Sequence, residues 1–326
     1  MGRNLPLTIA MKRDARLEKI ISRELEPHVC SFVNLNSISS ALTDVECLWV
    51  DMTTPLGEKE MLNFPNLQYL VSPTTGLTHL SSKIDRNQIK VISLQGESQF
   101  LESITSTSEL AWGLGLAVWR KIFPASREYS NDTSIRQSFA SLQLRNLTIG
   151  LVGFGRIGKR LLTYASAFEM KTLYFDPYLS KETLSQNFLA TRLDSLEELC
   201  EKSDMLFVVA SHRNEDSKNY PILKSNHLNR MKATSILINV SRGSLIDETT
   251  VYELIKNNRL AGIGMDVLAR EENSPSNSEI DPLQELQNLG YNVIITPHLG
   301  GMCWDAYDSC QKFVAQKLKT FLTSQS

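Results

Sequence analysis

The sequence predicts an α/β protein with two Rossmann- or flavodoxin-like domains, each built on a doubly wound parallel sheet, and a cleft between them. Two observations predict this class. Continuous apolar runs of strand length alternate with helical segments, which is typical of parallel sheets covered by helices on both faces. The chain has 326 residues, enough for two domains with a sizeable buried core.

The N-terminal third predicts the smaller domain. A helix is expected over Leu17–Leu25, among strands at Leu7–Ala10, Val29–Val33, Val45–Val50 and Leu67–Val71. At the other end of the chain, Trp304–Leu322 predicts a helix. Because that helix follows the last strand of the second domain, we expect it to cross back to the first.

Between the two regions, Thr105–Ile122 predicts a helix that is apolar nearly all round. Such a helix must be buried on more than one face. A central core helix explains the pattern, and a helix that also forms a subunit contact explains it equally well.

The second domain shows the more regular alternation. The expected strands are Leu147–Val152, Lys171–Phe175, Met205–Ala210, Ser235–Val240, Gly262–Val267 and Asn292–Thr296. The expected helices are Arg156–Ala167, one whose last residues are Leu228–Lys232, and Asp247–Asn258, for which Asp247 is a suitable N-cap. Together these elements predict one parallel sheet with helices on both faces.

A glycine-rich turn joins the first of these strands to its helix. Gly153 permits the tight turn, Gly155 allows backbone to approach a pyrophosphate, and Gly158 allows the helix to pack on the strand. The helix N-terminus adds free N–H groups and the positive end of a dipole. The next strand ends at Asp176, whose carboxylate suits a ribose diol and repels a 2′-phosphate. An isolated GxGxxG pattern also occurs in other α/β turns. Here a strand precedes it, a helix and a second strand follow it, and an acid ends that strand at the expected distance. This combination predicts an NAD-binding domain.

Composition excludes several classes of function. The net charge is −2, so no basic field exists to attract nucleic acid or an anionic membrane. No signal-peptide core and no bilayer-spanning apolar stretch is present. The five cysteines are scattered without a CxxC pair, which predicts reduced thiols in a cytoplasm and no metal site.

Three polar residues follow successive strands, where open α/β sheets place their ligands. Arg242 carries a planar guanidinium suited to a carboxylate. His298 lies on a Pro-His turn and is suited to proton transfer, because imidazole changes protonation near neutral pH. Glu271 is the candidate carboxylate that orients the ring and favours its charged form. Each residue alone also fits a structural role, but together they predict a catalytic set.

With these motifs the chain resembles the D-isomer-specific 2-hydroxyacid dehydrogenases, the family of phosphoglycerate, glycerate and formate dehydrogenases. The motifs that carry the resemblance are Gly150–Gly158, Ile238–Gly243, Gly264–Val267 and Thr296–Gly301. The resemblance implies that Arg242, Glu271 and His298 are the catalytic residues. It implies phosphate contacts at Arg156 and Ile157, a further cofactor contact at Val240, and a nicotinamide contact at Asp266. It also implies that backbone N–H groups of the loop containing Thr75 and Gly76 hold the substrate carboxylate.

The resemblance further implies how the chain is divided into domains. Residues 1–104 and 302–326 would form one discontinuous substrate domain, and residues 105–301 the NAD-binding domain, with the active site in the cleft. The family resemblance also implies a homodimer. Members that bind phosphorylated substrates tend to carry a basic residue after the strand that ends near Val50, whereas this chain has Asp51 there. The spacer before His298 is longer than usual, so Glu272 remains an alternative to Glu271.

We therefore expect an NAD-dependent enzyme that interconverts a D-2-hydroxy acid and its 2-oxo acid, acting on a non-phosphorylated small molecule. Two alternatives remain open at this point. One is an NAD-sensing regulatory protein of the corepressor type on the same fold. The other is an NAD enzyme of different chemistry, which the Pro297-His298-Leu299-Gly300-Gly301 segment disfavours.

Overall fold

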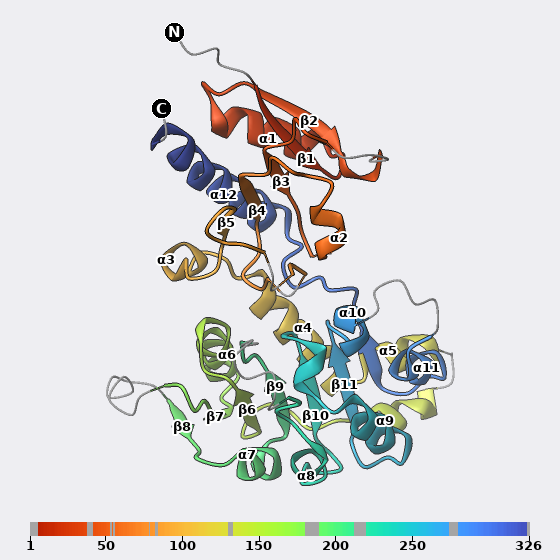
Figure 1. Ribbon diagram of the computed structural model, residues 1–326. Helices are drawn as coiled ribbons and strands as arrows, with labels where there is room; N and C mark the ends of the chain where they lie inside the picture. Colours follow the sequence, from red (N-terminus) through yellow and green to blue (C-terminus); the bar gives the residue numbers. More distant parts are fainter. Residues whose placement is uncertain are drawn as a thin grey trace. The chain divides into compact units, whose positions relative to one another are not determined.

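The computed structural model forms two compact units, residues 1–104 with 302–326 and residues 105–301 (Figure 1). The residues it describes are 6–37, 42–52, 54, 56–77, 79–81, 84–129, 133–179, 189–211, 220–273 and 280–324. The chain leaves the first unit after residue 104 and returns to it at residue 302, so the first unit is discontinuous in sequence.

The first unit contains a five-stranded sheet in the order β2-β1-β3-β4-β5, with all neighbouring strands parallel. Its strands are β1 (Leu7–Met11), β2 (Cys30–Asn34), β3 (Cys47–Trp49), β4 (Tyr69–Ser72) and β5 (Lys90–Ser93). This is the flavodoxin-like order, in which the order of the strands across the sheet reverses between β1 and β3. The sequence analysis missed β5, a four-residue strand that begins with an exposed lysine.

The helices of the first unit are α1 (Ala15–Leu25), α2 (Glu58–Met61), α3 (Ser98–Leu101) and α12 (Trp304–Ser324), with a 3₁₀ turn at Leu35–Ser37. The side chain of Asp14 caps α1 by accepting the N–H groups of Arg16 and Leu17. Helices α1 and α12 pack side by side on the sheet (Figure 1). The buried Ile21 and Leu318 belong to the same core cluster, so the C-terminal helix completes the core of the first unit.

The second unit contains a seven-stranded sheet in the order β12-β11-β10-β9-β6-β7-β8, again parallel throughout. Its strands are β6 (Thr148–Val152), β7 (Lys171–Phe175), β8 (Ala190–Arg192), β9 (Met205–Val208), β10 (Ile236–Asn239), β11 (Gly262–Met265) and β12 (Val293–Ile295). The order is that of a Rossmann fold with one additional strand, and the switch point lies between β6 and β9. The predicted α/β class with doubly wound parallel sheets is confirmed.

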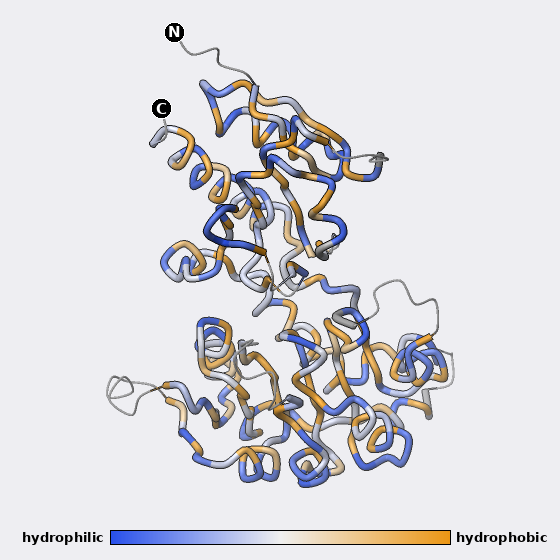
Figure 2. The backbone as a smooth tube through the Cα atoms, viewed as in Figure 1, coloured by the Kyte–Doolittle hydropathy of each residue, from blue (hydrophilic) through white to orange (hydrophobic). Residues whose placement is uncertain are grey.

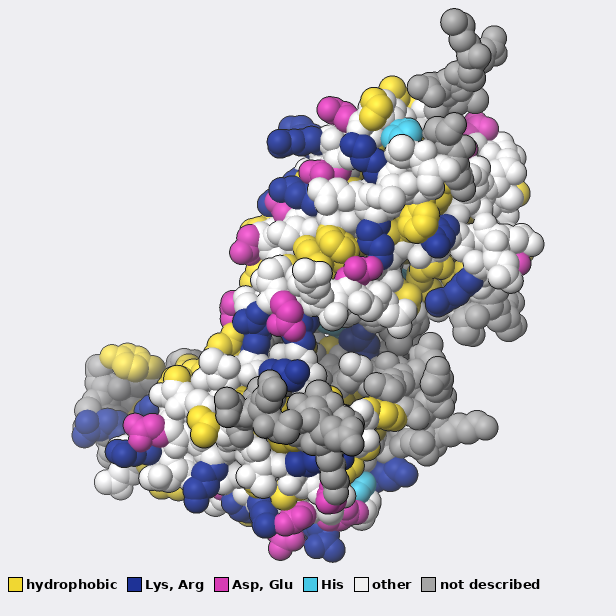
Figure 3. Space-filling model, turned by 90° about the vertical axis from the view of Figure 1, so that its left-hand side faces the viewer, with side chains coloured by type: hydrophobic (Ala, Val, Ile, Leu, Met, Phe, Trp, Pro, Cys, Tyr) yellow, Lys and Arg dark blue, Asp and Glu magenta, His cyan; other side chains and the backbone are white. Residues whose placement is uncertain are grey.

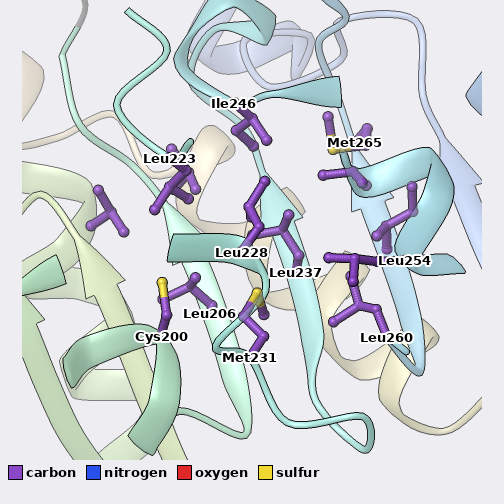
Figure 4. Close-up of a cluster of buried hydrophobic side chains, with 14 of the residues drawn as sticks. Cys200, Leu206, Leu223, Leu228, Met231, Leu237, Ile246, Leu254, Leu260 and Met265 are labelled. Atoms are coloured by element: carbon purple, nitrogen blue, oxygen red, sulfur yellow. The ribbon is translucent and has the colours of Figure 1, made fainter. Parts of the chain in front are cut away.

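Helices cover both faces of this sheet. They are α4 (Ser106–Trp119), α5 (Ile122–Arg127), α6 (Arg156–Ala167), α7 (Leu196–Lys202), α8 (Ser225–Leu228), α9 (Glu248–Lys256), α10 (Ala269–Asn273) and α11 (Pro282–Asn288), with 3₁₀ turns at Thr133–Phe139 and Gly243–Leu245. Helices α4 and α6 share one core cluster with the strands, and α7, α9 and α11 share the other. Figure 4 shows the second cluster, where Leu237 of β10 lies among side chains such as Leu228 and Leu254. Figure 2 shows the apolar colouring concentrated along the strands, as expected for a sheet buried on both faces.

Two helix predictions were wrong in extent. The segment Thr105–Ile122 is not one helix, because Lys121 adopts a left-handed backbone conformation with φ of 51° and separates α4 from α5. Leu228–Lys232 was expected to form the last part of a helix, but α8 already ends at Leu228. The wide burial predicted for α4 is confirmed, since Ala111, Trp112 and Val118 are all at most 9% exposed.

The surface carries charges of both signs. Figure 3 shows Lys and Arg side chains interspersed with Asp and Glu on the face in view, consistent with the net charge of −2. Within the described residues, no helix has the length and apolar character needed to cross a membrane.

Candidate functional site

The loop between β6 and α6 depends on two glycines at which a side chain would collide with backbone. Gly153 has φ of 94°, and a Cβ there would lie 2.6 Å from the Cα of Ala210. A Cβ on Gly158 would lie 2.7 Å from the carbonyl oxygen of Gly153. Gly155 caps α6, and nothing lies within 4 Å of the position its Cβ would take. The loop therefore leaves open space in front of the helix N-terminus, as an approaching phosphate requires.

Asp176 lies directly after β7 and is tied to this loop. Its Oδ2 accepts the N–H of Phe154 at 2.9 Å, and its Oδ1 accepts the N–H of Tyr178 at 3.0 Å. The Phe154 ring stacks on Tyr174 of β7 with centroids 4.0 Å apart, which joins the loop to that strand. Each carboxylate oxygen keeps further acceptor capacity for a ribose hydroxyl.

The other predicted cofactor contacts are close to these groups in the fold. Arg156 and Ile157 form the first turn of α6, and both are half-buried. Val240 follows β10 and is 7% exposed. Its N–H donates to the carbonyl of Val208 at 3.4 Å, which places it beside the end of β9 at the switch side of the sheet.

The turn after β10 carries Arg242. The guanidinium Nη1 donates to the carbonyl oxygen of Ser241 at 2.7 Å, and the Ser241 hydroxyl donates to the carbonyl of Ala210. The side chain of Asn239 closes the turn: its Oδ1 accepts the N–H of Ser241 at 3.0 Å and its Nδ2 donates to the carbonyl of Arg242 at 2.9 Å. Asn239 is fully buried and Arg242 is half-buried.

Gly243 brings the Arg242 turn against α10. A Cβ on Gly243 would lie 2.0 Å from the backbone nitrogen of Ala269, so only glycine fits there. The neighbouring N–H of Leu268 donates to Oε1 of Glu271 at 3.1 Å. Glu271 is therefore fixed on a segment that packs directly on the Arg242 turn.

His298 and Glu271 form a direct pair. The Nδ1 of His298 lies 3.0 Å from Oε2 of Glu271, with side chains 28% and 35% exposed. Because Nδ1 faces the carboxylate, it is the nitrogen that carries a proton in either charge state, and Nε2 is the nitrogen that can exchange one. The side chain of the alternative partner, Glu272, lies outside the described residues.

The turn that holds His298 is anchored by Asp266. The carbonyl of Asp266 accepts the N–H of His298 at 3.0 Å. Its Oδ1 accepts the hydroxyl of Thr296 at 2.6 Å and the N–H of Leu299 at 2.7 Å, and its Oδ2 accepts the N–H of Gly300 at 2.8 Å. His298 has φ of 56°, an uncommon value for a residue with a side chain, and these bonds stabilise it.

Asp266 is a buried acid, 1% exposed. Burial raises the pKa of its carboxyl, while the hydrogen bonds from Thr296, Leu299 and Gly300 and the nearby His298 oppose that rise. Its Oδ2 accepts one of these three bonds, so it can accept another from a carboxamide.

The predicted substrate loop lies in the first unit, just after β4. Thr75 is exposed and Gly76 is half-buried. The hydroxyl of Thr74 donates to the carbonyl of Gly76 at 2.8 Å, and its oxygen lies 2.9 Å from the hydroxyl of Ser72. The loop is thus held by its own side chains, with its backbone turned at the end of a strand.

No group of His, Cys, Asp and Glu that could hold a metal ion occurs among the described residues. All five cysteines are free thiols. Burial raises the pKa of the Cys200 thiol to about 12 and raises that of Cys47 still further from its ordinary value.

Residues 112–300 match the family model for the D-isomer specific 2-hydroxyacid dehydrogenase, NAD binding domain. The chain belongs to the D-isomer specific 2-hydroxyacid dehydrogenase family. Its second unit therefore carries the NAD-binding domain of this family, and NAD is its cofactor.

Relatives within the family are moderately similar. The chain is 32% identical over 223 residues to D-3-phosphoglycerate dehydrogenase of Methanocaldococcus jannaschii, covering 68% of this chain and 40% of that protein. It is 30% identical over 221 residues to glyoxylate reductase of Korarchaeum cryptofilum, covering 66% of this chain and 62% of that protein. The chain thus spans less than two thirds of the length of either relative.

The fold matches solved 2-hydroxyacid dehydrogenases over nearly the whole chain. D-Lactate dehydrogenase from Aquifex aeolicus, solved with NAD and lactic acid, superposes with a TM-score of 0.79. The match covers 97% of this chain and 96% of that one at 20% identity, which establishes the shared fold.

The sequence analysis gave no role to three residues that build this site. Asn239 closes the Arg242 turn, Ser241 bonds that turn to Ala210 just after β9, and Thr296 donates to Asp266, which holds the His298 turn. One signal was available for Asn239, because a lone amide at the end of an otherwise apolar buried strand must find hydrogen-bond partners.

Proposed function

We propose that this protein is an NAD-dependent dehydrogenase that interconverts a D-2-hydroxy acid and its 2-oxo acid. The observation that carries the proposal is the pair of His298 and Glu271 at 3.0 Å, beside the Arg242 turn in an NAD-binding domain. A proton donor, its carboxylate partner and a carboxylate-binding guanidinium are the groups that reduction of a 2-oxo acid requires.

In the reductive direction, bound NADH supplies the hydride that reaches the carbonyl carbon. His298 donates a proton from Nε2 to the carbonyl oxygen, while Glu271 orients the ring through Nδ1. Arg242 binds the substrate carboxylate and polarises the carbonyl. We also propose the backbone N–H groups of Thr75 and Gly76, in the loop after β4, as contacts for a substrate carboxylate.

The substrate proposed is non-phosphorylated. Asp51 follows β3, at the edge of the first sheet where open α/β sheets bind ligands, and is half-buried. Its Oδ1 accepts a hydrogen bond from the hydroxyl of Thr54 at 3.3 Å. An acid at this edge disfavours a phosphoryl group on the substrate by like-charge repulsion.

The assembly proposed is a homodimer formed through the region around α4. Beyond the residues of α4 that face the sheet, Leu116 lines a groove of about 330 Å³ together with Leu142, Leu144 and Phe168. Leu142 is 69% exposed and Phe168 is 41% exposed. Apolar side chains that gather on one face support contact with a second copy.

The free cysteines support a reducing compartment such as the cytoplasm.

The test is turnover of a panel of 2-oxo acids with NADH, followed by His298→Ala on any substrate found. We expect the variant to bind NADH with nearly unchanged affinity, since the loop from Gly153 to Gly158 and Asp176 are untouched. Turnover should fall by about 10²–10⁴-fold, the usual scale for general acid–base catalysis. Near-full activity of the variant would refute the role of His298. Tight NADH binding without reduction of any 2-oxo acid would instead favour the NAD-sensing alternative.

A further inference from the structure

Asn239 is the last residue of β10, and its side chain is fully buried among apolar strand residues. We propose that Asn239 is the positioning residue that sets Arg242 for the substrate carboxylate and fixes it relative to His298. The inference rests on the proposed function, because it assigns Asn239 a part in that reaction.

Both ends of the Asn239 amide are used by the Arg242 turn. Oδ1 accepts the N–H of Ser241 at 3.0 Å, and Nδ2 donates to the carbonyl of Arg242 at 2.9 Å. The same carbonyl accepts the N–H of Leu245 at 3.3 Å, so the bond from Asn239 joins the strand to the following 3₁₀ turn. The backbone of Arg242 is therefore held from the residue that ends the strand.

The main chain of Asn239 continues the connection toward the histidine. Its carbonyl accepts the N–H of Asp266 at 2.9 Å, and the carbonyl of Asp266 accepts the N–H of His298 at 3.0 Å. Asn239 thus has its side chain in the Arg242 turn and its backbone bonded to the residue that anchors His298. A shift of Asn239 changes the distance between the carboxylate-binding group and the proton donor.

The amide is the group this position requires. A leucine would suit a buried strand better but would leave the Ser241 N–H and one acceptor site of the Arg242 carbonyl without partners. An aspartate keeps an acceptor for Ser241 but has no donor for Arg242. A serine is too short to reach both groups. The burial of a polar side chain in β10 is thus explained by the turn that it closes.

The chain contains a matched control in Asn292. This half-buried asparagine precedes β12 and likewise donates Nδ2 to backbone carbonyls, those of Val118 and Ala261, each at 2.9 Å. It lies at the opposite end of the strands from Arg242. Asn292→Ala removes the same type of bond and is expected to lower stability without changing catalysis.

The experiment measures kcat, KM and NADH affinity of Asn239→Ala, Asn239→Asp and Asn292→Ala on a 2-oxo acid that the wild type reduces. We expect both Asn239 variants to lose about 10²-fold in kcat/KM, mostly as a raised KM, because misplacement of a binding group by about 1 Å has that effect. NADH affinity should stay within about twofold, and Asn292→Ala should keep wild-type kcat/KM. Asn239→Asp preserves the shape of the side chain and serves as the test if Asn239→Ala does not fold.

A double-mutant cycle separates positioning from a general structural role. If Asn239 acts through Arg242, then adding Asn239→Ala to Arg242→Ala should reduce kcat/KM by less than about threefold further. The inference would be overturned if Asn239→Ala reduced kcat/KM equally with and without Arg242. It would also be overturned if Asn239→Asp kept the wild-type kcat/KM. Failure of the wild type to reduce any 2-oxo acid would overturn the proposed function itself, and the two failures are therefore distinguishable.

Discussion

Replacement of Glu271 by glutamine tests how the carboxylate supports His298. The two oxygens of Glu271 accept from two donors, Nδ1 of His298 at 3.0 Å and the N–H of Leu268 at 3.1 Å. A glutamine has one acceptor oxygen, so it can satisfy only one of them and presents its NH₂ group to the other. Hydrogen bonds to charged groups contribute about 1.5–3 kcal/mol. Because the Glu271 side chain is 35% exposed, we expect the lower end of that range.

A loss of about 1.5 kcal/mol corresponds to roughly a tenfold fall in kcat. We expect KM for the 2-oxo acid to change little, since Arg242 still binds the carboxylate. The assay is steady-state NADH oxidation with single-turnover traces, which shows whether the affected step is the chemical one.

The matched control for this variant is Glu197→Gln. Glu197 pairs with Nε2 of His227, also at 3.0 Å, at the junction of α7 and α8. This change removes a carboxylate–imidazole pair of the same length away from Arg242 and His298, and kcat should stay at the wild-type value. If Glu271→Gln retained full kcat, or if both variants lost the same activity, Glu271 would have no specific part in proton transfer.

Three further predictions concern the cofactor, the pH dependence of stability and the assembly. Wild-type protein should prefer NADH to NADPH by a wide margin in kcat/KM, and Asp176→Ala should narrow that margin. The variant should also bind NADH more weakly, because Asp176 accepts two loop N–H groups. Equal kcat/KM for the two cofactors in the wild type would contradict the role of Asp176. Burial raises the pKa of the Cys200 thiol to about 12, so its contribution to stability is present below its ordinary pKa of about 8.5 and is lost as pH rises toward 12. Between about pH 9 and 11 the wild type should lose up to about 1.4 kcal/mol of unfolding free energy per pH unit through this group. In urea titrations the unfolding free energy of Cys200→Ala should therefore decline less steeply with pH. Equal declines in the two proteins would contradict this. Light scattering should give twice the chain mass of 36.7 kDa, and Leu142→Asp should shift the mass toward the monomer; a monomeric wild type at micromolar concentration would refute the dimer.

The sequence predicted some elements with the same bounds that the structure shows. The run Lys171–Phe175 was predicted with the bounds of β7, and Arg156–Ala167 with those of α6, because apolar runs and a glycine turn mark their limits. The missed strands β5 and β8 have four and three residues and contain exposed positions. Periodicity over so few residues does not distinguish a strand from a loop, and pairing with β4 and β7 is what forms them.

The residues proposed for the site could be found from the sequence, but not the bonds that hold them. An arginine, an acid and a histidine after successive strands mark the edge of a sheet where ligands bind. The pairing of His298 with Glu271 spans 27 positions, and no local pattern indicates it. The anchoring of the His298 turn by Asp266 is hidden in the same way, because it consists mostly of bonds to backbone N–H groups, which any residue type supplies.

The sheet itself explains why side chains so far apart in sequence meet with this accuracy. Asn239 of β10 pairs with Met265 of β11, and Met265 pairs with Ile295 of β12, so three neighbouring strands end on one level. The segments that follow carry Arg242, Glu271 and His298. The Arg242 turn is bonded to Asn239 at the end of β10, and the His298 turn is bonded to Asp266 just after β11. The distance of about 4.8 Å between neighbouring strands therefore helps to set the spacing of these two groups. A rigid parallel sheet thus determines the geometry that flexible loops alone would not maintain, which is the condition for aligning a bound carboxylate with a proton donor.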